Sequence, residues 1–540
     1  MKKQIYVASM LSAAMFLAAC EGDDGAPGPS GANGANGLNS LVAFRDIPKG
    51  DAVCLGGGTA LDSGIDANND GVLDAGEVTA TEILECEATP TIRALHASPD
   101  APAVNIIVNG ATALTGVDFS QGSGFVPVVE SNTVQVQAIT PDGANPIVID
   151  AAVDLDYNTE ASILAVGTVD TADDGLGVFA LPIVNPSDER ITQGFFRAQI
   201  VHGAPSAPPV NVYVTGVADD LASASPVNGV GTPLDFEDFT ERLEVPEGDY
   251  RIRIVVDGDA TLTPVFDTGD TGISLAAGAD LMIVAIDNTG PGASAVDLIV
   301  LDGTAAAKIE DAATPASAIA VHLSPDAPAV DILADVNSTA NDEAIPLVRN
   351  VAFGQFCDLN AVPAPGDYTI NVVANSDNSI VATSFPLAVE QSTEATAVVS
   401  GFLDLAGAGL TPAITALPAI DDRRSIATET KLRITHASPS TGLVDIYLVA
   451  PGTVIDNTVT PAFEDVPFGA DTGILSIANG TYDAVVTAAD STTPAIELLG
   501  LDFTAGGAVL NVIARDLAAG GLDPAPLIID MTNVPACATP

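Results

Sequence analysis

The stretch His96-Ala-Ser-Pro-Asp-Ala-Pro-Ala-Val-Asn105 decides the fold, because a version of it stands at every histidine of the chain. The other versions read His202-Gly-Ala-Pro-Ser-Ala-Pro-Pro-Val-Asn211, His322-Leu-Ser-Pro-Asp-Ala-Pro-Ala-Val-Asp331 and His436-Ala-Ser-Pro-Ser-Thr-Gly-Leu-Val-Asp445. The 4 histidines are 106, 120 and 114 residues apart (202 − 96, 322 − 202 and 436 − 322). Chance could not place every histidine in this way, so the chain contains four internal repeats.

Each repeat has the sequence pattern of a domain built from short strands. We call each of these four stretches a histidine phrase. Proline fixes φ and lacks an N–H donor, so a histidine phrase must connect two strands and cannot lie inside one. The strands that follow it, such as residues 104–108, alternate or are apolar, and later runs such as 281–286 and 509–513 are largely apolar. About seven short strands in roughly 110 residues predict an immunoglobulin-like β-sandwich.

Two further landmarks recur after the histidines. A phenylalanine follows in every repeat (Phe119, Phe236, Phe353 and Phe463). Gly-x-Tyr then precedes an alternating strand in three repeats (Gly248-Asp-Tyr250, Gly366-Asp-Tyr368 and Gly480-Thr-Tyr482). The first repeat lacks Gly-x-Tyr and has therefore diverged.

The four phrases resemble the signature His-Ala-Ser-Pro-Asp-Ala-Pro-x-Val-Asp-Val-Tyr of a bacterial domain family of unknown function, which usually occurs in tandem on exported proteins. The resemblance covers nearly all of residues 89–535 and is close in repeats one and three. It is looser in repeat two, and in repeat four Ser440-Thr441-Gly442 replaces Asp-Ala-Pro. The resemblance implies a sandwich fold and a surface location, and it transfers no catalytic residue.

A chain of 540 residues is too long for one hydrophobic core. We expect an all-β protein of four tandem immunoglobulin-like β-sandwiches, each folding independently, after a small N-terminal calcium-loop module. The expected segments are a signal peptide (1–20), a collagen-like tether (21–38), the small module (39–88) and the repeats (89–190, 191–312, 313–424 and 425–540).

Charge and composition exclude two classes of partner. Lys and Arg total 17 against 71 Asp and Glu, for a net charge of −54, yet 47% of residues are hydrophobic, as in a folded acidic protein. A field of this sign repels phosphate backbones, so nucleic acid is not an expected partner. Trp is absent, which excludes a carbohydrate site built on a stacked Trp platform.

The N-terminus has the order of features typical of an exported lipoprotein. Lys2 and Lys3 precede an apolar stretch that runs into Leu17-Ala18-Ala19-Cys20, which resembles a lipobox. The resemblance implies cleavage before Cys20 and lipid on its thiol, which would hold the chain at the cell envelope. The acidic start Glu21-Gly22-Asp23-Asp24 fits an outer-membrane or surface-exposed lipoprotein. The alternatives are an ordinary signal peptide with an incidental cysteine, or a transmembrane anchor.

Glycine falls at every third position from Gly22 to Gly37, which is the collagen period. These few triplets predict either a flexible tether or a short trimerising stalk.

The next segment, residues 66–77, matches a twelve-residue calcium loop. Its oxygen ligands would come from the side chains of Asp66, Asn68, Asp70, Asp74 and Glu77 and the carbonyl of Val72, with Gly71 at the sharp turn. Gly56-Gly57-Gly58 before it is not helical, so a single structural calcium site is expected and not an EF-hand pair. The alternative is an Asx-rich turn that binds no metal.

The remaining cysteines predict disulfides in an oxidising compartment. Cys54 and Cys86 bracket the calcium loop and are expected to pair. Cys357 and Cys537 are left, and pairing them would link repeats three and four. Residues 39–86 also resemble a short module found after collagen-like tethers in bacterial lipoproteins, which is too small for much core and would need a disulfide and a metal.

The sequence predicts a protein that is not an enzyme. His96, His202, His322 and His436 are expected to hold turns through backbone hydrogen bonds, with metal ligation as the alternative. Asp267-Thr-Gly, Asp270-Thr-Gly and Asp471-Thr-Gly resemble aspartic-protease triplets but occupy unrelated positions in their repeats. The favoured hypothesis is a lipid-anchored binding, adhesion or spacer protein that contacts a surface protein or polysaccharide. The alternatives are a surface hydrolase that uses acidic residues and a trimeric collagen-stalked adhesin.

Overall fold

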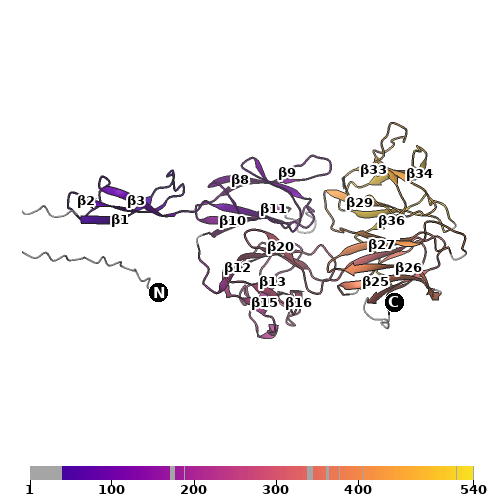
Figure 1. Ribbon diagram of the computed structural model, residues 1–540, viewed down its shortest axis with the longest axis horizontal. Coiled ribbons are helices and arrows are strands. Elements are labelled where there is room, and N and C mark those ends of the chain that lie inside the picture. Colours follow the sequence, from indigo (N-terminus) through magenta and orange to yellow (C-terminus); the bar gives the residue numbers. More distant parts are fainter. Residues whose placement is uncertain are drawn as a thin grey trace, which may run out of the picture. The chain divides into compact units, whose positions relative to one another are not determined.

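The computed structural model describes residues 39–170, 177–187, 189–336, 344–359, 364–375, 377–404, 407–518 and 520–538. The predicted signal peptide, Cys20 and the tether lie outside these residues. The chain divides into two compact units at Cys86 and Glu87. The described residues form strands and one 3₁₀ turn (Leu221–Ser223) without an α-helix, so the predicted all-β class is confirmed (Figure 1). No helix among them is long and apolar enough to cross a membrane.

Unit 1 is a small antiparallel sheet of three strands in the order β1-β2-β3. The strands are β1 (Asn39–Ile47), β2 (Gly58–Asp66) and β3 (Val78–Cys86). Among the residues that the structure describes in this unit, the buried apolar cluster consists of Ile47, Cys54 and Ala60. A disulfide joins Cys54 to Cys86, whose Cα atoms are 5.2 Å apart.

Unit 2 contains the four repeats, and each repeat is a sandwich of two sheets (Figure 1). In repeat 1 one sheet has the order β11-β10-β4-β7 and the other the order β6-β5-β8-β9. The strands are β4 (Thr91–His96), β5 (Val104–Val108), β6 (Ala111–Val117), β7 (Val126–Pro127), β8 (Ser131–Ala138), β9 (Ile147–Asp154), β10 (Thr159–Val166) and β11 (Phe179–Pro186).

Repeats 2 to 4 repeat this plan. Repeat 2 has sheets β14-β12-β18-β19-β20 and β13-β15-β16, with β17 paired to β15. Its strands are β12 (Phe195–His202), β13 (Val210–Gly216), β14 (Leu243–Pro246), β15 (Gly248–Val256), β16 (Pro264–Asp267), β17 (Ile273–Leu275), β18 (Asp280–Asp287), β19 (Val296–Leu301) and β20 (Ala306–Ile309).

Repeat 3 has sheets β24-β21-β27-β28 and β23-β22-β25-β26, and repeat 4 has sheets β32-β29-β35-β36 and β31-β30-β33-β34. The strands of repeat 3 are β21 (Ser317–His322), β22 (Val330–Val336), β23 (Ile345–Val351), β24 (Phe356–Leu359), β25 (Gly366–Ala374), β26 (Asp377–Val389), β27 (Glu394–Ser400) and β28 (Thr415–Ile420). Those of repeat 4 are β29 (Glu429–His436), β30 (Val444–Val449), β31 (Phe463–Val466), β32 (Leu475–Ala478), β33 (Thr481–Ala488), β34 (Pro494–Asp502), β35 (Val509–Ala514) and β36 (Leu527–Asp530).

The histidine phrase carries the chain from one sheet of the sandwich to the other. Each histidine is the last residue of its first strand, and a valine eight residues later begins the next strand, as with His96 and Val104. The first strand pairs in parallel with a later strand in every repeat: β4 with β10, β12 with β18, β21 with β27 and β29 with β35. We call the sheet that contains this pair the parallel-pair sheet.

The tyrosine of each Gly-x-Tyr motif hydrogen-bonds to the backbone just before a central strand of the other sheet. The hydroxyls of Tyr250, Tyr368 and Tyr482 donate to the carbonyl four residues earlier, at 2.8, 2.7 and 2.9 Å. Strand register places Asn132 of repeat 1 at the position of Tyr250, because Ala138 and Val256 pair with the corresponding residues Val104 and Val210. The Asn132 amide donates to the Val129 carbonyl at 2.6 Å, so repeat 1 retains the fastening with a shorter side chain.

The parallel-pair sheets are buried on both faces, because the repeats pack in pairs. In β18 the alternate residues Leu281, Ile283 and Ala285 lie in the core of repeat 2. Met282, Val284 and Ile286 face the other way, into a cluster that includes Leu164 and Ile183 of repeat 1. A strand buried on both faces is apolar along its length, which explains why residues 281–286 form a continuous apolar run.

Repeats 3 and 4 pack through the same sheets. Ile319 and Val398 of repeat 3 share a cluster with Ile513 and Ile529 of repeat 4. The four expected sandwiches therefore pack in two pairs. Each repeat has its own core, but one of its two sheets is covered by a neighbouring repeat, because that sheet is apolar on its outer face too.

The C-terminal segment returns from repeat 4 to repeat 3. A disulfide joins Cys357 of β24 to Cys537. Beside it, the Asp358 N–H donates to the Pro535 carbonyl at 2.9 Å and the Cys537 N–H to the Asp358 carbonyl at 2.8 Å. Covalent and backbone bonds thus reinforce the apolar contact between these two repeats.

Candidate functional site

The four histidines hold the turns that they begin. In each phrase the histidine Nε2 lies 2.9–3.2 Å from the carbonyl oxygen six residues later, which belongs to Pro102, Pro208, Pro328 or Gly442. In repeats 1, 3 and 4 the serine N–H two residues later donates to Nδ1 at 3.4 Å. Nδ1 is then an acceptor, so Nε2 carries the proton and donates to the carbonyl.

A phenylalanine edge packs against each buried ring. The partners of the four histidines are Phe119, Phe236, Phe353 and Phe468, with centroids 6.3–6.5 Å apart. The identification of Phe463 as the fourth landmark is wrong, because Phe463 lies in β31 and packs on the repeat 4 core. Burial lowers the pKa of all four imidazoles and so favours the neutral rings.

The phrase aspartate fastens a second loop in repeats 1 and 3. The Asp100 carboxylate accepts the N–H groups of Val169 and Asp170, both at 2.8 Å. Asp326 accepts those of Leu403 and Asp404 at the same distance. In both repeats the acceptor is on the phrase and the donors follow the parallel strand.

Repeats 2 and 4 reverse this arrangement. Ser206 replaces the aspartate and donates through Oγ to Asp287 at 2.7 Å. Ser440 likewise donates to Asp516 at 2.8 Å. In every repeat the N–H of the residue after the histidine donates to a carbonyl of the parallel strand, at Ala165, Ala285, Val399 or Ala514. Two residues after that carbonyl, repeats 2 and 4 have Asp287 and Asp516, whereas repeats 1 and 3 have Gly167 and Gly401. Two residue pairs therefore make the same contact: Asp on the phrase with Gly after the parallel strand, or Ser on the phrase with Asp after the strand. A comparison of the repeats would have revealed this exchange from sequence.

The exchange predicts a compensating pair of substitutions. Ser206→Asp places a second carboxylate beside buried Asp287 and should lower the free energy of unfolding by about 2 kcal/mol. Adding Asp287→Gly recreates the repeat 1 pairing and should recover about 1 kcal/mol or more. Urea unfolding followed by circular dichroism measures both variants and Asp287→Gly alone. Additive losses would show that the two positions are not coupled.

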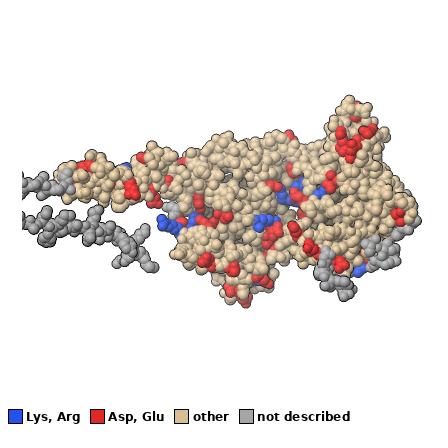
Figure 2. Space-filling view, in the orientation of Figure 1, with Lys and Arg blue, Asp and Glu red and all other residues tan. Residues whose placement is uncertain are grey.

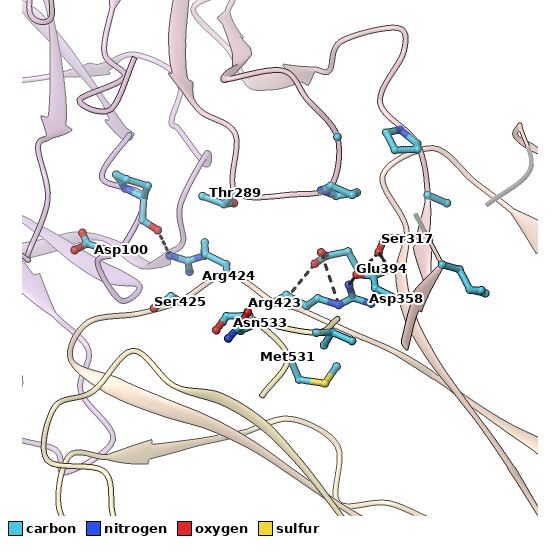
Figure 3. Close-up of a pocket in the computed structure, with 18 residues that line it drawn as sticks. Asp100, Thr289, Ser317, Asp358, Glu394, Arg423, Arg424, Ser425, Met531 and Asn533 are labelled. Atoms are coloured by element: carbon cyan, nitrogen blue, oxygen red, sulfur yellow. Dashed lines mark hydrogen bonds and ion pairs between the residues drawn. The ribbon is translucent and has the colours of Figure 1, made fainter. Parts of the chain in front are cut away.

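The described part of unit 2 contains a cavity of about 750 Å³ where the four repeats meet (Figure 3). The histidine phrase of repeat 1 contributes Asp100, and the turn after β18 contributes Thr289. Repeat 3 contributes Ser317, Asp358 and Glu394 from the starts and ends of its strands, and the C-terminal segment contributes Asn533. Arg423 and Arg424 enter from the connection between repeats 3 and 4.

Arg424 ties this connection to repeat 1. Its Nη1 donates to the carbonyls of Pro99 and Ala101 at 3.2 and 2.9 Å, and its Nη2 to Asp118 at 2.6 Å. The guanidinium carbon also lies 5.5 Å from the centroid of the Phe119 ring. The side chain is only 9% exposed. Through these contacts Arg424 joins the connection between repeats 3 and 4 to the histidine phrase of repeat 1.

Arg423 points the opposite way, into repeat 3 (Figure 3). It donates to the Ser317 hydroxyl at 2.9 Å and to Asp358 at 3.1 Å. Its Nε lies 3.9 Å from Glu394. Burial raises the pKa of Glu394, although Arg423 acts in the opposite direction. The charges of the cavity are therefore largely compensated by one another.

A second cavity of about 590 Å³ lies in repeat 2 and includes two of the Asp-Thr-Gly aspartates. Arg251 pairs with both Asp267 and Asp270, at 2.6 and 2.5 Å. Burial raises the pKa of Asp267, but Arg251 and the Gly269 N–H outweigh it, so the net shift is downward. Asp471 belongs to repeat 4, where it accepts the Gly473 N–H at 2.6 Å.

The predicted calcium loop connects β2 and β3 of unit 1. Buried Asp66 accepts the N–H groups of Asp70 and Gly71 at 3.1 and 3.0 Å. Gly71 has φ +83°, a conformation that favours glycine. Val72 is exposed, and its N–H donates to Asp70 at 2.8 Å.

Glu77 closes the loop by accepting N–H groups from Ala67 at 2.8 Å and Asp74 at 3.1 Å. The Asn68 amide donates to the carboxylates of Asp70 and Asp74 at 3.0 and 3.1 Å. All predicted ligands thus share one loop, and its carboxylates hold backbone N–H groups as in Asx turns. Within the described residues no group of three His, Cys, Asp or Glu side chains has a metal-holding arrangement.

Basic side chains gather in a few groups on the face of the molecule in Figure 2, with acidic side chains beside them. Several bridge neighbouring repeats. Arg242 of repeat 2 pairs with Glu160 of repeat 1 and donates to the Pro186 carbonyl at 2.8 Å. Arg93 of repeat 1 donates to the Leu301 carbonyl of repeat 2 at 3.3 Å. The scarce cations of this acidic chain are thus largely engaged by the protein itself.

Two family models match the chain. A model described as "Domain of unknown function (DUF4397)" matches residues 90–213, 196–333 and 316–447. Each match begins at a first strand and extends through the histidine phrase into the following repeat. A second model, "Domain of unknown function (DUF7151)", matches residues 39–84.

A search of curated proteins found no match. Among solved structures, one similar chain is the "Product complex of a multi-modular glycogen-degrading pneumococcal virulence factor SpuA", at 11% identity and a TM-score of 0.13. The similarity covers 56% of this chain and 37% of that one, and a likeness at this level carries no functional argument.

Proposed function

The chain belongs to the family described as a domain of unknown function (DUF4397), and we propose that it is a non-catalytic binding protein of the cell envelope. The observation that carries the proposal is the cavity of about 750 Å³ to which all four repeats contribute. Concave sites at domain junctions are preferred places for ligands. The paired sheets and Arg424 hold the walls of this cavity in place, which reduces the entropy cost of binding.

The chemistry of the cavity indicates the kind of partner. Arg423, Arg424 and Glu394 are engaged by protein groups, so they favour neither a strongly anionic nor a strongly cationic ligand. Thr289 and exposed Asn533 supply neutral hydrogen-bonding groups. A surface protein or polysaccharide segment with neutral polar groups fits this lining.

Pull-down from surface extracts tests the proposal. Wild-type protein should recover a specific partner, whereas Asn533→Trp should reduce recovery about tenfold because its ring fills the mouth of the cavity. Asn457→Trp, an equally exposed asparagine of repeat 4 outside the cavity lining, is the matched control. Equal recovery by both variants, or none by wild type, would count against binding in this cavity.

A surface hydrolase is the rival, and it requires two acidic groups with displaced pKa values in one pocket. The pKa of Glu394 is raised in the junction cavity, whereas the lowered pKa of Asp267 belongs to the cavity of repeat 2. Arg423 lies beside Glu394 and Arg251 pairs with Asp267. This separation supports binding over catalysis.

The proposal includes a lipid anchor on Cys20 at the outer membrane or cell surface, based on Leu17-Ala18-Ala19-Cys20. Several acyl chains would bind a bilayer almost permanently, because each buried methylene contributes about 0.8 kcal/mol.

Cell fractionation with fatty-acid labelling tests the anchor. Cys20→Ala should abolish labelling and move the protein out of the membrane fraction, while Cys357→Ala should remain labelled. Label on the Cys20→Ala protein would place the lipid elsewhere.

We also propose that residues 66–77 bind one structural Ca²⁺ through Asp66, Asn68, Asp70, Asp74, Glu77 and the Val72 carbonyl. The support is their convergence on one loop, closed from both ends by Asp66 and Glu77. Bound Ca²⁺ would draw the carboxylate oxygens of this loop inward and stabilise a module that has little core.

Calorimetric titration should detect one Ca²⁺ with a dissociation constant on the order of 10⁻⁴–10⁻³ M, the range of extracellular modules. Asp66→Ala should abolish the heat signal. Glu82→Gln, an exposed substitution on β3, should leave it unchanged. If wild type gives no signal, or Asp66→Ala binds normally, the loop is an Asx-rich turn without metal.

A further inference from the structure

One face of the unit 1 sheet carries exposed apolar side chains within the described residues, beside Asp46 of β1 and Glu82 of β3 on the same side. Val42 and Phe44 of β1 pair with Ser63 and Leu61 of β2, and paired residues of an antiparallel ladder point to the same side. Val42 is 68% exposed and Phe44 is 76% exposed. Ile65, two residues beyond Ser63 on the same side, is 44% exposed. We call these residues (Val42, Phe44, Leu61 and Ile65) the apolar face.

The opposite side of the sheet holds what core the module has. Arg45 pairs there with Asp62 at 2.7 Å, and the Thr81 hydroxyl donates to Asp62 at 2.6 Å. Ile47, Cys54 and Ala60 form the buried cluster on that side. A three-stranded sheet with so small a core would gain stability if its second face were also buried.

The preceding sequence indicates what covers it. Glycine occupies every third position from Gly22 to Gly37, and β1 begins two residues later, at Asn39. A collagen triple helix contains three chains and needs glycine at every third position, because only glycine fits at its axis; residues 22–37 meet this requirement. If three chains associate there, three copies of β1 would begin next to one another, with Val42 and Phe44 five and seven residues after Gly37.

The sizes of the two parts make them interdependent. The apolar face has four residues, against the roughly 20–30 a side of a standard interface, and six glycine triplets (22, 25, 28, 31, 34 and 37) would make only a short triple helix. Joined in one chain, each raises the effective concentration for the other. We propose that the apolar face packs against the same face of two further copies, so that unit 1 is a trimerisation module.

Sedimentation velocity on residues 21–540, which lack the lipid but keep the glycine triplets, tests the proposal. Wild-type protein should sediment as a trimer. Phe44→Asp should sediment as a monomer at the same micromolar concentration. Val230→Asp is the matched control, because Val230 is 81% exposed but belongs to repeat 2, and it should remain trimeric.

Oxidative cross-linking is a second test, and its result does not depend on whether Phe44→Asp folds. Phe44→Cys should give intermolecular disulfides on a non-reducing gel, whereas Val230→Cys should not. A monomeric or dimeric wild type, a trimeric Phe44→Asp protein, or no cross-linked Phe44→Cys would each overturn the proposal. These results are independent of partner recovery by the junction cavity, so the two proposals can fail separately.

Discussion

The structure of unit 2 depends on the burial of each parallel-pair sheet on both of its faces. One face closes the sandwich of its own repeat, and the other packs on the neighbouring repeat, as Ile283 and Met282 do from adjacent positions of β18. Each fully buried apolar side chain contributes about 1.5–3 kcal/mol. An exposed ion pair contributes about 0–1 kcal/mol. The apolar contact therefore dominates the pairing, and the disulfide and arginine contacts reinforce it.

Electrostatics decides how the two pairs meet. A chain with a net charge of −54 repels itself, and three of its arginines, Arg93, Arg242 and Arg424, bind across the contacts between repeats. Arg424 does more than neutralise Asp118, because it also binds two carbonyls of the histidine phrase. The histidine phrase of repeat 1 thus holds its own turn through His96. Its carbonyl groups bind Arg424 from the connection between repeats 3 and 4.

The same contact between the phrase and the parallel strand is made in two ways, by Asp100 with backbone donors and by Asp287 with Ser206. Either pairing satisfies the buried polar groups, so the repeats could diverge at these positions without losing the turn. Asn132 in place of tyrosine is a second such case. The residues at these positions differ among the repeats, but the contact they make occupies the same place in each sandwich.

The histidine phrases and strand periodicity were enough to predict four β-sandwich repeats, because these features act over a few neighbouring residues. The candidate ligands of residues 66–77 were local in the same way. Only the tertiary structure decided the pairing of repeats and the junction cavity. Residues such as Arg424 and Ala101 lie far apart along the chain, and no local pattern specifies which outer sheet face meets which neighbour.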